Sequence, residues 1–250
     1  MGTDRMEATP RGCGHPALYG RVATLVAKRG ASQHVLDIPA GNGVLSARLL
    51  AAGHRVVAAD LVPEGFRVPG VECVAADMSQ PLPFEAGRFD VVACLEGIEH
   101  LRHPYAFVEE CRRILRPGGC LILSTPNVLK LTSRVKFLLG GFLNAFGRPL
   151  NEHRVRHGLY GHIALMSYYE ARFMLHCLGF RILAVTTSRG TVSDWLCTPL
   201  VPGIALFTWH ALRREQDPQQ RASNAEILHH VLSADLLFGK HLVLVAERRG

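Results

Sequence analysis

The sequence predicts an α/β fold of the doubly wound kind, in which helices cover both faces of a mostly parallel sheet. Short apolar segments alternate with amphipathic ones along most of the chain. Residues 35–50, VLDIPAGNGVLSARLL, have the pattern of a strand, a glycine turn and a helix, which begins a βαβ unit. The chain has 250 residues and 48% hydrophobic content, enough to bury the core of one such domain over residues 1–250.

We predict each helix and strand from the spacing of its hydrophobic residues and from the glycine or proline residues at its ends. Leu18, Val22 and Val26 recur at helical spacing, for example, and Gly30 is placed to end their helix. We expect strands at 34–38, 55–59, 71–76, from 89 onward, 120–124, 178–188 and near the C-terminus. We expect helices at 15–29, 44–52, 104–115, 129–146 with a break at Gly140-Gly141, 167–177, and from Ser223 or Asn224 to Leu232.

The turn after the first strand holds Gly41 and Gly43 and follows Asp37. Its glycines let the backbone approach a ligand, and the following helix offers free N–H groups. A dinucleotide-binding turn normally begins with glycine, and its third glycine is here replaced by Ser46. The Asp37 carboxylate would repel phosphate but suits a cation such as an α-ammonium group. From this segment alone, a dinucleotide-binding turn remains the alternative.

Two more carboxylates end the next two strands. Asp60 follows Gly43 by roughly the twenty residues that a βαβ unit needs to bring an acid to a ribose. Asp77 follows the third strand and precedes Met78. A solvated loop position is the alternative for Asp60. Asp90, at the start of the fourth strand, lies at the opposite end of the sheet, where a structural role is expected.

These motifs resemble the class I S-adenosylmethionine-dependent methyltransferases. The resemblance covers residues 15–127 and includes the Pro81-Leu82-Pro83 segment, FDVV at 89–92 and LRPGGCLILSTPN at 115–127. It implies a Rossmann-like seven-stranded sheet of order 3-2-1-4-5-7-6, with the last strand antiparallel beside strand five. It also implies S-adenosyl-L-methionine as cofactor, bound by Asp37, Pro39, Ala40, Gly41, Asn42, Gly43, Asp60, Leu61, Asp77, Met78 and Leu95.

The segment ACLEGIEHL at 93–101 carries the most reactive side chains. If a helix starts near Leu95, then Glu96, Glu99 and His100 share one face. They could bind a divalent metal, or the imidazole could act as a base; a packed histidine is the alternative. The segment is similar to one in the ubiquinone-biosynthesis O-methyltransferases. That resemblance implies a divalent cation, such as Mg²⁺, at Glu96, Glu99 and His100, and catalytic roles for Glu99 and His100.

Residues 128–166 are predicted to form an insert that builds the acceptor site. They hold His153, His157 and His162, whose spacing is not that of a zinc-binding helix. His162 stands in a Gly-His-Ile segment. We expect it to line the acceptor site and to serve there as a base.

Residues 194–214 are predicted to form a hydrophobic lid or an interfacial segment. Seventeen residues, 196–212, carry no charge, but Pro199, Pro202 and Gly203 are expected to break a helix, which argues against a membrane span. The two alternatives are a lid over the acceptor site and a segment in the bilayer interface. Arg213 and Arg214 suit anionic headgroups, so the second alternative predicts peripheral membrane contact.

The predicted reaction is methylation of a small, rather apolar acceptor through oxygen, with nitrogen or carbon as alternatives. A non-catalytic cofactor-binding module is the alternative of another class. The net charge of +7 is scattered, and the chain lacks the Pro-Pro and Pro-Cys turns of DNA methyltransferases, so no nucleic-acid partner is expected. Seven cysteines without a C-x-x-C pair and no apolar leader favour a cytoplasmic location. Nothing in the sequence indicates an oligomeric state.

Overall fold

A computed structural model describes residues 15–142, 161–190 and 192–250. Its seven strands form one sheet of order β3-β2-β1-β4-β5-β7-β6. All neighbours are parallel except β7, which runs antiparallel to both β5 and β6. The predicted fold class and strand order are therefore confirmed. The strands are β1 (His34–Asp37), β2 (Arg55–Asp60), β3 (Cys73–Ala75), β4 (Phe89–Leu95), β5 (Leu115–Pro126), β6 (Phe180–Thr186) and β7 (His241–Arg248).

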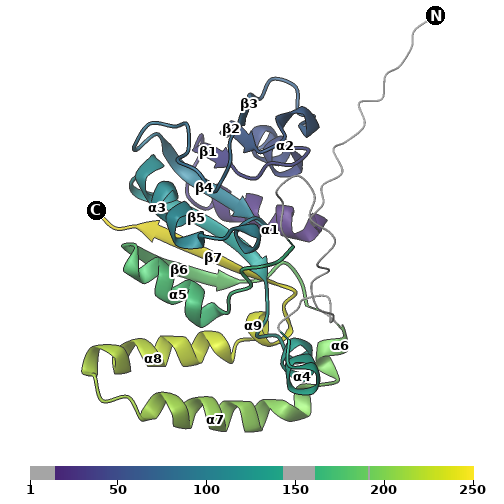
Figure 1. Ribbon diagram of the computed structural model, residues 1–250, viewed down its shortest axis with the longest axis vertical. Coiled ribbons are helices and arrows are strands. Elements are labelled where there is room, and N and C mark those ends of the chain that lie inside the picture. Colours follow the sequence, from purple (N-terminus) through teal and green to yellow (C-terminus); the bar gives the residue numbers. More distant parts are fainter. Residues whose placement is uncertain (1–14, 143–160, 191) are drawn as a thin grey trace, which may run out of the picture.

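Helices cover both faces of this sheet (Figure 1). One face, with Val91 and Ala93 of β4, packs on α1 and α2; the other, with Val92 and Cys94, packs on α3 and α5. The helices are α1 (Pro16–Ala27), α2 (Val44–Ala51), α3 (Pro104–Ile114), α4 (Leu131–Gly140), α5 (Tyr168–Cys177), α6 (Val192–Trp195), α7 (Val201–Arg213), α8 (Pro218–Val231) and α9 (Ala234–Phe238), with single 3-10 turns η1 (Pro63–Gly65), η2 (Ile98–His100) and η3 (Thr198–Leu200).

Local sequence explains where several helices begin. Ser167 caps α5 through a capping box with Glu170, and Pro104 occupies the first turn of α3. Gly43 precedes α2 with φ of 91°, where a Cβ atom would lie 2.4 Å from Val68 and 2.7 Å from Phe66. Only glycine fits that conformation and space, so Gly43 fixes the start of α2.

Some predicted boundaries are wrong. Strand β5 starts at Leu115 rather than at residue 120: α3 stops at Ile114, and β5 already pairs with β4 at Leu115 before a register shift. The Arg248 guanidinium holds this junction, since it donates hydrogen bonds to the carbonyls of Arg112 and Leu115. Strand β3 has three residues rather than six. Helix α8 starts at Pro218, capped by Asp217, not near Asn224.

The prolines of residues 194–214 begin helices instead of breaking them. Pro199 lies in the first turn of η3 and Pro202 in that of α7. Helix α7 has 13 residues, a length of about 20 Å, against a bilayer core of about 30 Å. Within the described ranges, no helix is long and apolar enough to cross a membrane. Helices α7 and α8 form a hairpin beyond the α5 side of the sheet (Figure 1).

Candidate functional site

A cavity of 720 Å³ opens at the carboxyl ends of the parallel strands. This is the edge of an open α/β sheet at which ligands normally bind. The predicted cofactor residues line it, with the exception of Gly43, which instead packs behind the turn. Those that line it are Asp37, Pro39, Ala40, Gly41, Asn42, Asp60, Leu61, Asp77, Met78 and Leu95.

Asp37 is buried at the end of β1, at the floor of the cavity. One oxygen accepts hydrogen bonds from the Ser46 backbone N–H at 3.1 Å and from its hydroxyl at 2.7 Å. Desolvation raises the pKa of Asp37 to about 7, and the two Ser46 hydrogen bonds oppose that shift. Ser46, at the position of the absent third glycine, is thus the support of this carboxylate. A cationic ligand against Asp37 would favour its ionised form.

Asp60 holds the glycine turn and keeps acceptor capacity for a ligand. Its two oxygens accept hydrogen bonds from the backbone N–H groups of Gly41, at 2.8 Å, and Val62, at 3.0 Å. An ionised carboxylate offers about four lone-pair sites, so two remain on Asp60, which lines the cavity. This geometry suits a pair of ribose hydroxyl groups.

Asp90 lies away from the cavity. It accepts a hydrogen bond from the His34 backbone N–H at 2.7 Å and forms a 2.9 Å ion pair with Arg116. Its structural interpretation is therefore supported.

The predicted helix over Glu96, Glu99 and His100 is wrong. Strand β4 ends at Leu95, Glu96 has φ of 51°, and η2 is a single 3-10 turn. The turn packs tightly against Pro39 at Gly97. A Cβ atom at that position would lie 2.6 Å from the Pro39 ring. The three side chains therefore do not share one helical face.

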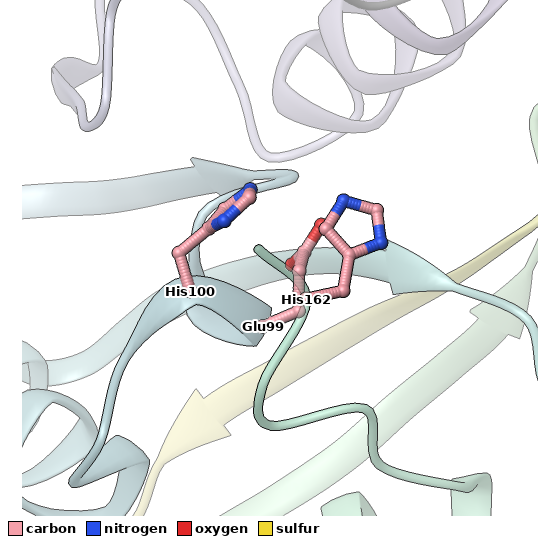
Figure 2. Close-up of side chains that lie close together, drawn as sticks. All are labelled: Glu99, His100 and His162. Atoms are coloured by element: carbon pink, nitrogen blue, oxygen red, sulfur yellow. The ribbon is translucent and has the colours of Figure 1, made fainter. Parts of the chain in front are cut away.

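The structure instead brings Glu99 and His100 together with His162. Their potential ligand atoms all lie within 4.8 Å of one another. The two imidazole centroids are 4.9 Å apart, and the Ala164 N–H donates to the Glu99 carbonyl at 2.9 Å. Figure 2 shows the Glu99 carboxylate between the two rings. His100 and His162 line the cavity, whereas Glu99 is fully buried behind them. His153 and His157 lie outside the described residues.

Burial raises the pKa of Glu99, and its own backbone N–H and the Thr125 hydroxyl, which lie near but make no well-formed hydrogen bond to its oxygens, oppose the shift. Burial, and then the neighbouring His100, lower the pKa of His162. A buried carboxylate without such hydrogen bonds is costly, so this cluster is suited to a proton or a cation.

Glu96 turns toward a different group of residues. The Ser124 hydroxyl donates to one of its oxygens at 3.1 Å, and His241 at the start of β7 lies 3.6 Å from the other. The second imidazole nitrogen of His241 lies 2.5 Å from the Ser188 hydroxyl. Burial and the adjacent Glu99 raise the pKa of Glu96. Ser124, Ser188 and His241 were not predicted, although the expected place of β7 beside β5 implies that its first residues reach this edge.

Comparisons with known proteins agree with this geometry. A family model described as a methyltransferase domain matches residues 36–123. The ubiquinone biosynthesis O-methyltransferase of Psychrobacter cryohalolentis is 33% identical over 108 residues, which are 39% of this chain and 42% of that protein. For the Pseudomonas aeruginosa protein of the same name, identity is 34% over 109 residues, 39% of this chain and 46% of the relative. The chain thus spans less than half the length of these curated relatives.

Solved structures share the fold. A SAM-dependent methyltransferase from Archaeoglobus fulgidus superimposes with a TM-score of 0.59 at 15% identity, covering 92% of this chain and 93% of that one. A Burkholderia thailandensis 1,6-didemethyltoxoflavin-N1-methyltransferase with bound S-adenosylhomocysteine superimposes with a TM-score of 0.52 at 16% identity. The match covers 94% of this chain and 80% of that one.

The family model thus marks residues 36–123 as a methyltransferase domain, and the motifs and the strand order agree with the class I S-adenosylmethionine-dependent methyltransferases. Within that class, the matched curated relatives carry out O-methylation in ubiquinone biosynthesis, by their names.

Proposed function

We propose that the protein transfers the methyl group of S-adenosylmethionine to an oxygen of a small, rather apolar acceptor. The observation that carries this proposal is the continuity of one cavity. Its aspartate-lined side suits the cofactor, and the same cavity reaches His100 and His162 between apolar residues such as Leu95 and Pro126. A methyl group on the sulfonium and an acceptor beside the imidazoles would then meet in one enclosed space.

The reaction is an in-line displacement, in which a new oxygen–carbon bond forms as the carbon–sulfur bond breaks and S-adenosylhomocysteine leaves. Positioning of the two reactants is the main task of such an enzyme. The acceptor proton must go to a base within hydrogen-bond reach. His162 is the candidate, because its lowered pKa keeps the ring neutral near pH 7. His100, which stacks edge-on against it, is the second candidate.

Methyl transfer to nitrogen or carbon and cofactor binding without turnover remain the alternatives. The Burkholderia neighbour is an N-methyltransferase by name. Incubation with methyl-labelled S-adenosylmethionine and matched phenol, aniline and activated-methylene acceptors separates these outcomes. We expect label on the phenol oxygen. Label on nitrogen or carbon would replace the oxygen proposal, and S-adenosylmethionine binding without transfer to any acceptor would favour the binding module.

The cluster of Glu99, His100 and His162 also fits a divalent cation. One carboxylate and two imidazoles form a ligand set that Mn²⁺, Fe²⁺ and Zn²⁺ accept. This set is less typical of Mg²⁺, which prefers oxygen ligands. We propose these residues as the ligands, with His162 in the place predicted for Glu96. A bound cation would lower the pKa of an acceptor hydroxyl next to it.

Helix α7 is proposed to contact an anionic lipid surface. Its outward face exposes Leu206 by 66% and Phe207 by 76%, and Arg213 lies 4.4 Å above the Trp209 ring. Arginine beside exposed aromatic residues suits the headgroup region of a bilayer. Among the described residues that line the cavity, none belongs to α6 or α7, so an interfacial role is proposed here in preference to a lid.

Flotation with vesicles tests this contact. The protein should rise with anionic vesicles at low salt and should stay behind with zwitterionic ones. Arg213→Glu with Arg214→Glu should abolish flotation, whereas Arg48→Glu with Arg55→Glu, an equal charge change on exposed residues of α2 and β2, should not. Equal flotation of both double variants would reject the proposed surface.

A further inference from the structure

The cavity is electrically divided. Three aspartates, Asp37, Asp60 and Asp77, line the side built by β1, β2 and β3. Arg189 and Lys240 line the other side, where β6 ends and β7 begins. The aspartates match the ammonium and ribose of the cofactor, whereas the cationic side has no counterpart in those two groups.

Backbone hydrogen bonds fix the two cations beside each other. The Lys240 N–H donates to the Arg189 carbonyl at 2.9 Å, and the Asn127 N–H donates to the Lys240 carbonyl at 3.1 Å. The Asn127 side chain donates to the carbonyls of Leu236 and Gly239, both at 2.9 Å. Asn127, directly after β5, therefore holds the segment that carries Lys240. A ligand would meet these cations on a backbone that is fixed by hydrogen bonds.

The nearest acid that lines the cavity on this side is Glu96; burial raises its pKa, and the positive charge of Lys240 opposes that rise. In the described part of the chain, no carboxylate forms an ion pair with Arg189 or Lys240. His15 and Lys130 also line this side, although Lys130 is paired with Asp194 at 3.6 Å. The pKa of His241 falls to about 4, through burial first and then through Lys240, His15, Arg189 and Lys130. Positive charge thus converges on one region of the wall.

The position of this region favours the acceptor over the cofactor. Strands β4 and β5 lie between β1 and β7, so Asp37 and Lys240 are separated by at least three strand spacings, about 14 Å. The carboxylate of a methionine moiety lies next to its ammonium group, near Asp37. The acceptor enters between these ends, beside His100 and Glu96.

We infer that Arg189 and Lys240 form a subsite for an anionic group, a carboxylate or a phosphate, on an otherwise apolar methyl acceptor. This inference rests on the proposed function and names its substrate class. A guanidinium binds either anion in a forked geometry, and an ammonium adds a second charge-assisted hydrogen bond. The methylated oxygen would lie at the other end of the acceptor, toward the sulfonium.

The test uses protein saturated with S-adenosylhomocysteine and three probes of equal chain length: octyl phosphate, octanoate and octanol. Calorimetry should show at least one anionic probe binding about tenfold or more tightly than octanol, because charge-assisted hydrogen bonds are roughly twice as strong as neutral ones. Whichever anion binds more tightly assigns the group. Arg189→Gln with Lys240→Gln should remove the preference, and Arg213→Gln with Arg214→Gln, on α7, should retain it.

Three results would overturn the inference. They are equal binding of all three probes, an unchanged preference in the Arg189/Lys240 double variant, and loss of the preference only in the α7 variant. Weaker S-adenosylhomocysteine binding in the Arg189/Lys240 variant would also overturn it, since the cations would then hold the cofactor. Failure of the proposed function is distinct, because the wild-type protein would then bind no S-adenosylhomocysteine or transfer no methyl group.

Discussion

Replacing Glu99 by glutamine is expected to lower turnover by about 10²- to 10⁴-fold, the range of general acid–base catalysis. Glutamine keeps the shape of the side chain but removes the ionisable carboxyl group between His100 and His162. Without it, the two imidazoles lose the group that would hold either a proton or a cation beside the acceptor. The affinity for S-adenosylmethionine should stay within about twofold, because Glu99 does not line the cavity.

The same measurement separates a metal from a plain base. A chelator should reproduce the loss of turnover in the wild-type enzyme, and added Mn²⁺ or Zn²⁺ should reverse it, if Glu99, His100 and His162 are ligands. Loss in Glu99→Gln without any effect of the chelator would leave His162 or His100 as a base that Glu99 orients. Glu109→Gln, at an exposed position of α3, is the matched control and should retain full activity.

Replacing Asp60 by alanine is expected to weaken S-adenosylmethionine binding by about 1–3 kcal/mol, or roughly 5- to 150-fold. The variant loses the acceptor of the ribose hydroxyls and also the support of the glycine turn at Gly41. The loss should appear in calorimetric affinity, with turnover at saturating cofactor changed much less. Glu64→Ala, on the adjacent η1, is the control. Unchanged affinity in Asp60→Ala would remove Asp60 from the site.

The cofactor side of the cavity could be predicted from the sequence because local patterns define it. Asp37, Asp60 and Asp77 each end a short apolar strand, and parallel strands bring their carboxyl ends to one edge. Strand period and glycine position are short-range signals that predict the individual strands and the residues at their ends. The order of the strands and the cofactor role of Asp77 follow instead from the resemblance to the class I methyltransferases. Gly43, predicted to bind the cofactor, does not line the cavity and instead shapes the turn before α2.

The acceptor side depends on contacts between distant segments, which the sequence patterns do not specify. His162 reaches Glu99 and His100 across more than sixty residues. Lys240, just before β7, reaches Arg189, which follows β6, through a backbone hydrogen bond. The predicted helix over Glu96, Glu99 and His100 was wrong for a local reason: Gly97 packs against Pro39 and bends the chain there. The spacing of residues in the sequence does not predict the structure here, because a single tight contact determines the backbone conformation of the turn.

Calorimetric titration of the protein with S-adenosylmethionine and with NAD tests the central claim most directly. The acidic side of the cavity carries Asp37 at the position where a dinucleotide site places phosphate. S-adenosylmethionine should therefore bind at one site per chain, in competition with S-adenosylhomocysteine, and NAD should produce no binding heat. Binding of NAD with no binding of S-adenosylmethionine would contradict the account.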